Sequence, residues 1–188
     1  MNRRHTLGVA PGVAFALAVA LAACGPASPA PSGPSPAGSP ASDPGLAPVG
    51  AVERARVLRV VDGDTIRIDR GQGSEALRYI GIDTPETVRP DAPVEWMGVE
   101  AAESNRTLVE GREVVLERDV SDTDSFGRLL RYVWLEDGTG WLMVNLELVA
   151  RGYAAAVTYP PDLRWTDELR DAQAAARDAG VGLWGTPP

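Results

Sequence analysis

The chain has 188 residues, of which 44% are hydrophobic, so it can form one ordinary globular domain with short appendages. Its net charge of −8 argues against broad, non-specific attraction to nucleic acid or anionic lipid, because both are polyanions. The chain contains no lysine, so any anionic partner must meet a local group of arginines, whose planar guanidinium groups make forked contacts.

Residues 1–24 have the pattern of an export signal. Arg3 and Arg4 precede an apolar run whose length fits a signal peptide better than a membrane span. The run ends in LAAC followed by glycine, which resembles the lipobox of bacterial lipoproteins, a signal in which the cysteine, here Cys24, becomes the lipid-modified first residue. The resemblance implies an exported protein anchored by lipid to the cell membrane or envelope, on the extracytoplasmic side. The alternative is an ordinary cleaved signal with an incidental cysteine.

Residues 25–50 are rich in alanine, proline, serine and glycine, and cannot bury enough apolar surface to offset the entropy lost on ordering. We expect a disordered tether, partly extended by its prolines, that holds the following domain away from a surface. Residues 51–188 then form the folded domain.

The domain begins with a predicted hairpin. Residues 55–61 are β-branched and apolar, residues 65–68 alternate with a period of two, and the sequence DGD between them is a turn signal. The sequence ALRYIGI predicts a third strand over residues 76–82, which must end before Pro85.

Helical and strand patterns alternate over the rest of the domain. Residues 99–109 have helical spacing and end before Gly111, and each of the two later helices also ends at a glycine. The other expected elements are strands over 112–119 and 128–136 and helices over 141–151 and 165–179. Five strands with about three helices predict an α+β, mainly β fold: a five-stranded barrel of the oligonucleotide-binding (OB) type.

Histidine and cysteine chemistry are excluded from the folded domain, because His5 is the only histidine and Cys24 the only cysteine. Hydrolysis by Ser-His-Asp or Cys-His groups, zinc sites built from these residues and internal disulfides are therefore excluded as well. Carboxylates, arginines, hydroxyl groups and a hard metal bound by oxygen remain available for catalysis.

Three groups of acidic residues and arginines stand out. The first is Asp62-Gly63-Asp64, where glycine permits a tight turn between two acids; such a sequence is more often a plain hairpin turn than a metal site. The last group runs from Asp124 to Arg128, in a turn that leads into a strand, and a structural ion pair is its simpler explanation.

The second group lies in RYIGIDTPET, where Arg78 on a strand is followed by Asp83, Thr84 and Glu86. On an unbroken strand Arg78 and Asp83, five residues apart, would point to opposite faces. The chain must therefore leave the strand near Gly81 if both side chains are to serve one site.

Taken together and in order, the sequences VVDGDTIRI, RYIGIDTPET and DSFGRLLRYVW resemble the signature stretches of the staphylococcal-nuclease-like (thermonuclease) family. The resemblance covers about residues 52–184. It implies a five-stranded barrel with three helices, and a calcium-dependent endonuclease that cuts phosphodiester bonds of DNA, RNA or both.

The same resemblance implies roles for the charged groups. Calcium would be bound by carboxylates and one backbone carbonyl, a glutamate would be the general base for the attacking water, and two arginines would contact the phosphate. The implied residues are Asp64, Asp83 and the carbonyl of Thr84 for calcium, Asp62 as a weaker ligand through water, Glu86 as the base, and Arg78 and Arg128 for the phosphate.

Two positions depart from the family pattern. Phe126 stands where a tyrosine is common, and of the two tyrosines that often flank the nucleotide only Tyr159 remains as a candidate for substrate binding. Tyr159 has an alternative explanation as a surface aromatic without a role. The departures predict weaker polynucleotide binding or an altered substrate preference.

The remaining arginines and tryptophans have simpler explanations. We expect a solvated face of the last helix at Arg164, Arg170 and Arg177. Packing in the core is the simplest account of Trp134, Trp141, Trp165 and Trp184.

The leading hypothesis is a lipid-anchored, monomeric, calcium-dependent nuclease that acts on extracellular nucleic acid. The alternative from another class is a non-catalytic OB-fold module that binds single strands or a protein partner, and a third is a structural spacer on the envelope. Retention of all five residues Asp64, Arg78, Asp83, Glu86 and Arg128 favours the enzyme, because a mere binder has no obvious use for groups that stabilise a transition state.

Overall fold

The computed structural model describes residues 45–87, 93–136, 138 and 140–187. The predicted signal peptide with Cys24, and residues 25–44 of the predicted tether, lie outside the described residues. No helix in the described part of the chain has the length and apolar character needed to cross a bilayer.

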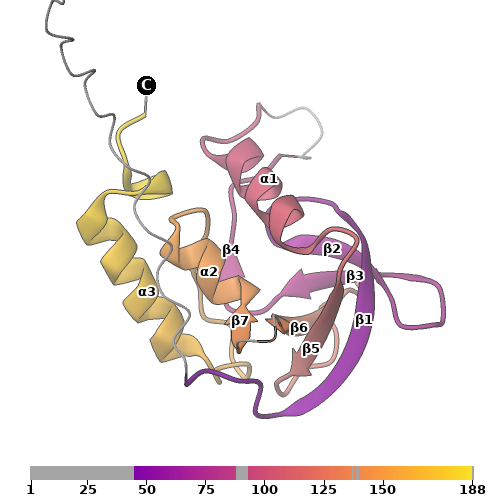
Figure 1. The fold of residues 1–188 in the computed structure, drawn as a ribbon. Helices are drawn as coiled ribbons and strands as arrows, with labels where there is room; N and C mark the ends of the chain where they lie inside the picture. Colours follow the sequence, from indigo (N-terminus) through magenta and orange to yellow (C-terminus); the bar gives the residue numbers. More distant parts are fainter. Residues whose placement is uncertain (1–44, 88–92, 137, 139, 188) are drawn as a thin grey trace, which may run out of the picture. The chain divides into compact units, whose positions relative to one another are not determined.

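The described part of the domain alternates strands and helices (Figure 1). Its strands are β1 (Ala51–Val60), β2 (Thr65–Asp69), β3 (Ser74–Tyr79), β4 (Ile82–Asp83), β5 (Glu113–Arg118), β6 (Leu129–Glu136), β7 (Trp141–Met143) and β8 (Ala155–Ala156). Its helices are α1 (Gly98–Val109), α2 (Val144–Ala150) and α3 (Thr166–Ala179), followed by a 3-10 turn, η1 (Gly182–Trp184).

A parallel pairing between β3 and β6 closes the main sheet. The sheet order is β3-β2-β1-β5-β6-β7, and β3 pairs in addition with β6, with Leu77 opposite Leu129 and Arg78 opposite Leu130. Five strands therefore form a ring in which each is hydrogen-bonded on both sides, and β7 extends from β6. This is the predicted OB-like barrel.

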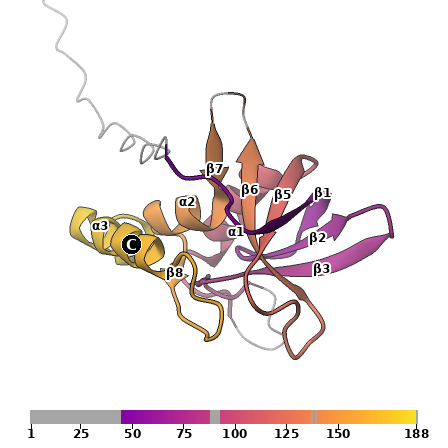
Figure 2. The same cartoon turned by 90° about the horizontal axis from the view of Figure 1, so that it is seen from below.

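The barrel interior is filled by aliphatic side chains that alternate along the strands. Ile66 and Ile68 on β2 and Val57 on β1 are fully buried, as period-two patterning requires. The alternation of β1 is interrupted between Val57 and Arg59, where the register with β2 shifts at a bulge. Helix α1 lies at one end of the barrel, whereas α2 and α3 pack together beside it (Figures 1 and 2).

Two predicted elements differ from the structure. The expected strand over 76–82 is divided by a turn at Ile80-Gly81 into β3 and β4. The expected helix over 141–151 was wrong at its start, because residues 141–143 pair with β6 as β7 and only 144–150 are helical. A strand partner overrides the local helical pattern there, which sequence periodicity does not show.

Glu117 is the centre of a buried hydrogen-bond network. Its side chain is fully buried, and its carboxylate accepts hydrogen bonds from indoles, a guanidinium and the backbone. The donors are Trp134 Nε1 at 2.9 Å, Trp165 Nε1 at 3.0 Å, Arg164 Nη1 at 2.8 Å, and the backbone N–H groups of Val49 at 3.3 Å and Gly50 at 3.2 Å. One carboxylate thus joins β5, β6, the start of α3 and the segment that leads into β1.

The network corrects one expectation and supports another. Arg164 does not lie on a solvated helix face: it precedes α3 and pairs with the buried Glu117. Trp134 and Trp165 are buried and meet edge to face with their ring centroids 5.5 Å apart, as the prediction of core packing requires.

We predict that Glu117→Gln lowers the free energy of unfolding by about 3 kcal/mol, because the amide turns an NH₂ group toward donors and removes the buried charge that Arg164 contacts at 2.8 Å. Of its two carboxylate contacts, Arg164 then keeps the longer one, with Asp119 at 3.5 Å. Urea unfolding followed by circular dichroism measures the change. The matched control is Glu113→Gln on the same strand, where the side chain is exposed and the loss should stay within about 0.5 kcal/mol. Equal stabilities of the two variants would contradict a central role for Glu117.

Candidate active site

Arg78 lies between two of the predicted calcium ligands. Its Nη1 is 2.9 Å from Asp64 Oδ2, and its Nη2 is 2.7 Å from Asp83 Oδ1. Only 15% of the Arg78 side chain is exposed, against 6% for Asp64 and 56% for Asp83, so the bridge runs from the buried side of the site to solvent. Three residues that the sequence predicted for one site are thus in direct contact.

The local fold brings these residues together in two ways. Thr65 pairs with Arg78 across β2 and β3, which places the preceding Asp64 beside the end of β3. The chain then leaves the strand at Gly81, whose φ of 78° is favourable only for glycine among common residues. Arg78 Nη1 also donates to the carbonyl oxygen of Ile82 at 2.9 Å, which holds the arginine against the turn. The predicted departure from the strand near Gly81 is therefore confirmed.

Asp64 is the most enclosed carboxylate of the site. Its Oδ2 accepts hydrogen bonds from both the backbone N–H (2.9 Å) and the hydroxyl (3.0 Å) of Thr84, and its Oδ1 accepts one from the Thr65 hydroxyl at 3.1 Å. The pKa of Asp64 is raised to about 7 because burial disfavours the charged form; Arg78 opposes this shift and the carboxylate of Asp62 adds to it.

Position 63 must be glycine because the side chain of Thr84 packs against it and leaves no space for a Cβ atom. A Cβ at position 63 would lie 2.6–2.7 Å from three side-chain atoms of Thr84, which no real contact allows. The DGD sequence is therefore more than a hairpin turn, because its glycine lets the loop pack against the segment after β4. Asp62 Oδ1 accepts a hydrogen bond from the backbone N–H of Asp64 at 3.2 Å, so the first acid of the loop supports the second.

The oxygen atoms at this site are of the kinds that bind calcium. Carboxylate and carbonyl oxygens are the ligands that calcium prefers, and a cation beside Asp64 would favour its ionised form. Within the described ranges, however, no three His, Cys, Asp or Glu side chains are grouped so as to hold a metal ion. A calcium ion here would depend on two carboxylates, with backbone oxygens and water as its other ligands. Thr84 contributes its N–H and hydroxyl to Asp64, which the sequence did not predict.

Glu86 follows Thr84 by two residues and is half-buried. Its backbone forms a reciprocal pair of hydrogen bonds with Glu95: the Glu86 N–H donates to Glu95 Oε2 at 3.1 Å, and the Glu95 N–H donates to the Glu86 carbonyl at 3.1 Å. The position of Glu86 is therefore fixed both by the segment that carries Asp83 and by the chain that leads into α1.

Closure of the barrel sets the position of Arg128 relative to Arg78. It immediately precedes β6, where Leu130 lies opposite Arg78. Residues two apart in an extended chain share a face, so Arg128 and Arg78 belong to the same face of neighbouring strands. Arg128 has no direct contact with Arg78, Asp64 or Asp83 in the described part of the chain.

Asp124 holds Arg128 in place. Asp124 Oδ2 is 2.6 Å from Arg128 Nε, and Asp124 Oδ1 accepts hydrogen bonds at 2.9 Å from the backbone N–H groups of Phe126 and Arg128. Burial alone would raise the pKa of Asp124, but these hydrogen bonds outweigh it and the pKa is lowered. The structural ion pair considered for this turn exists, and it orients the guanidinium through Nε rather than through the terminal nitrogens.

The aromatic candidates are exposed. Phe126 is 83% exposed and lies 5.5 Å from the guanidinium carbon of Arg128, while Tyr159 is 66% exposed. Tyr159 follows β8, which pairs with β4 so that Ala155 lies opposite Asp83. The structure therefore places Tyr159 on a segment adjoining the site.

Two buried asparagines support the site and were not predicted. Asn105 on α1 accepts a hydrogen bond from the Tyr79 hydroxyl at 2.9 Å and donates to the carbonyl of Asp62 at 3.3 Å. Asn145 on α2 donates to the carbonyl of Ile80 at 2.8 Å, at the turn where the chain leaves β3. Both side chains are fully buried. In the sequence, each is an asparagine on the apolar face of a predicted helix, which indicates a buried hydrogen bond but does not identify its partner.

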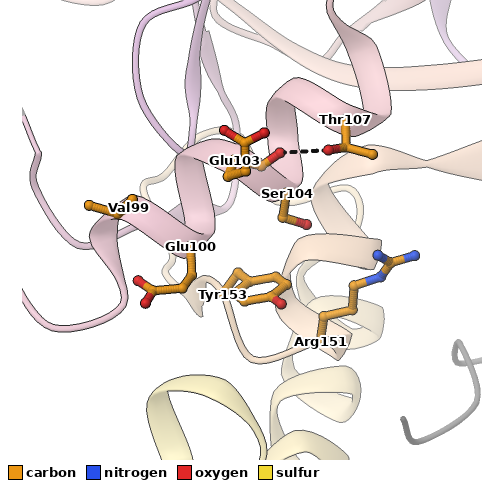
Figure 3. Close-up of a pocket in the computed structure, with 7 residues that line it drawn as sticks. All are labelled: Val99, Glu100, Glu103, Ser104, Thr107, Arg151 and Tyr153. Carbon is orange, nitrogen blue, oxygen red and sulfur yellow. Dashed lines mark hydrogen bonds between the residues drawn. The ribbon is translucent and has the colours of Figure 1, made fainter.

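A separate cavity of about 400 Å³ lies between α1 and the chain that follows α2 (Figure 3). Ser104 and Thr107 line it from α1, and Arg151 and Tyr153 from the other side. None of the predicted site residues lines this cavity, so it is distinct from the candidate active site.

Comparison with known proteins shows the family to which the chain belongs. The family model described as staphylococcal nuclease homologue matches residues 76–186. The chain is 39% identical to a thermonuclease of Staphylococcus hyicus over 129 residues, which is 69% of this chain and 74% of the relative. It is 40% identical to a thermonuclease of Staphylococcus intermedius over 128 residues, 68% of this chain and 74% of the relative. Endonuclease YncB of Bacillus subtilis is 34% identical over 128 residues, 67% of this chain and 59% of that protein. The chain therefore belongs to the staphylococcal nuclease homologue family.

Proposed function

We propose that this nuclease is a calcium-dependent endonuclease that hydrolyses phosphodiester bonds of DNA, RNA or both, and acts as a monomer on the extracytoplasmic side of the membrane. The observation that carries the proposal is the bridge of Arg78 between Asp64 and Asp83, with Arg128 immediately before β6, the strand that pairs with the one carrying Arg78. Two arginines beside a pair of carboxylates suit a reaction in which a phosphate gains negative charge next to a cation.

In this proposal the carboxylates bind the metal ion and Glu86 transfers the proton. Asp64, Asp83 and the carbonyl of Thr84 would hold calcium, and Asp62 would support it through water. Bound calcium would neutralise a phosphate oxygen and lower the barrier to attack. Glu86 would accept the proton of the attacking water, a role that requires only hydrogen-bond reach.

The two arginines would stabilise the phosphate as its charge increases. Arg78 is positioned by two carboxylates and by a backbone carbonyl, so its guanidinium is oriented before any substrate binds. Arg128 is oriented in the same manner by Asp124. Donors that are already in place need little rearrangement during the reaction, which is the main advantage of such groups.

The affinity for nucleic acid depends on residues around the site. Phe126 lacks the hydroxyl that a tyrosine would offer to substrate, and the net charge of −8 provides no general attraction to a polyanion. We infer that affinity for long nucleic acids is modest and depends on contacts close to the site.

Glu86→Gln should reduce calcium-dependent cleavage of single-stranded DNA by about 10²–10⁴-fold in kcat, because the amide cannot accept the proton. The assay follows cleavage by the purified protein with calcium and with a chelator in place of calcium. Glu100→Gln, at an exposed position on α1, is the control and should retain full activity. Absence of calcium-dependent cleavage by the parent chain would instead favour a non-catalytic binding module.

Arg128→Gln should lower kcat by about 10²–10³-fold with little change in thermal stability, because it removes a preorganised donor from a half-exposed position. Single-turnover rates under saturating substrate separate this effect from binding. Arg59→Gln, an exposed change elsewhere on the barrel, controls for loss of positive charge. An equal reduction in both variants would mean that net charge, rather than the placement of Arg128, sets the rate.

We also propose that the signal within residues 1–24 is cleaved on export just before Cys24 and that Cys24 carries the lipid anchor. The residues that follow, up to the segment in which the N–H groups of Val49 and Gly50 bind Glu117, would be a tether for the nuclease domain. The support is the LAAC sequence and the composition of the following segment. Mass spectrometry of the mature protein should find its N-terminus at a lipid-modified Cys24. An unmodified chain that starts elsewhere would refute the anchor.

A further inference from the structure

The segment before α1 packs directly on the backbone around Glu86. Two reciprocal hydrogen bonds join Glu86 and Glu95, and the N–H of Gly98 donates to the Glu95 carbonyl at 3.0 Å. A Cβ on Gly98 would lie 2.8 Å from Thr87 Cγ2 and 3.3 Å from the Glu86 carbonyl oxygen, so only glycine permits this close approach. The chain between residues 95 and 98 is therefore held beside the proposed general base.

Trp96 lies in this segment and is 42% exposed. Its neighbour Met97 has a φ of 66°, a left-handed conformation that costs energy for a residue other than glycine. Val94 and Val99 on either side are 53% and 60% exposed. An exposed tryptophan in a strained segment, with apolar neighbours, is not explained by packing, in contrast to the buried Trp134 and Trp165.

The chemistry of the site indicates which kind of ligand would contact Trp96. Arg78 and Arg128 provide cations for a phosphate, but the chain has no lysine and a net charge of −8, so charge alone contributes little to holding a strand. Stacking of a base on an aromatic ring adds affinity without positive charge and tolerates any sequence. Trp96 directly follows Glu95, which is hydrogen-bonded to the backbone of Glu86, so we infer that Trp96 is within reach of the nucleotides that flank a phosphate at the site.

We propose that Trp96 is a stacking platform for an unpaired nucleobase of the substrate strand, next to the phosphate that is cleaved. This inference rests on the proposed nuclease function. It makes the chain selective for single-stranded or locally open nucleic acid, because bases in an intact duplex already stack on one another. Trp96 is a binding residue in this account and takes no part in the chemical step.

Fluorescence anisotropy tests the proposal without cleavage. A short labelled single-stranded DNA, an abasic strand of the same length and the corresponding duplex are titrated with the Glu86→Gln chain in calcium. Trp96→Ala in this background should weaken binding of the single strand about tenfold, and Trp96→Phe should retain most of the affinity. Binding of the abasic strand and the duplex should not change. Val52→Ala, at an exposed apolar position on β1, is the control and should bind as the parent does.

The outcomes separate this inference from the proposed function. Equal affinity of Trp96→Ala and parent for the single strand, an equal loss on the abasic strand, or no binding by the parent would each overturn the stacking role. Calcium-dependent cleavage by the unmodified chain tests the nuclease function independently. If Trp96→Ala does not fold, the difference in fluorescence between parent and Trp96→Phe during titration decides: quenching of Trp96 by the strand supports the proposal, and its absence refutes it.

Discussion

The parallel pairing of β3 with β6 is the constraint on which the site depends. It joins residues about fifty positions apart, Arg78 opposite Leu130, and converts a meandering sheet into a closed barrel. Closure removes the free edges of two strands and places Arg78 of β3 opposite Leu130, two residues after Arg128. Without it Arg78 and Arg128 would belong to separate edges of an open sheet. The architecture that buries the core thus also sets the positions of the two arginines to which we assign phosphate binding.

Two buried carboxylates of this acidic domain, Glu117 and Asp64, are stabilised in different ways. At Glu117 a carboxylate is fully buried and its charge is satisfied by indoles, a guanidinium and backbone amides, so it serves to join elements. At Asp64 the carboxylate is also enclosed, but its burial raises its pKa to about 7 and its ion pair with Arg78 lies at the edge of solvent. The first arrangement is a closed network, whereas the second lies at the surface where we propose that a cation and an anionic substrate bind.

Much of the fold could be predicted from local patterns, and the failures share one cause. Strand alternation, glycine-terminated helices and the break at Gly81 all follow from short-range chemistry. Residues 141–143 have a helical pattern but form β7, because β6 provides a strand partner. Arg164 has the sequence context of a solvated helix, but a buried carboxylate on β5 binds it. In each case a pairing partner decided the outcome: the neighbouring strand β6 for residues 141–143, and Glu117, 47 residues earlier in the chain, for Arg164. Periodicity carries no information about such partners.

The sequence by itself determined the chemical inventory: oxygen ligands and guanidinium groups without imidazole or thiolate, in three motifs whose order resembles one family. It also determined that the chain must turn near Gly81, since strand geometry separates Arg78 from Asp83 otherwise. Only the tertiary structure decided that Thr84 bonds to Asp64 and that Asn105 and Asn145 hold the loops. It also decided that Trp96 is exposed in the segment whose Glu95 bonds to the backbone of Glu86. The physical reason is that hydrogen bonds and burial depend on which surfaces meet in space, and that is settled by closure of the barrel and packing of the helices upon it.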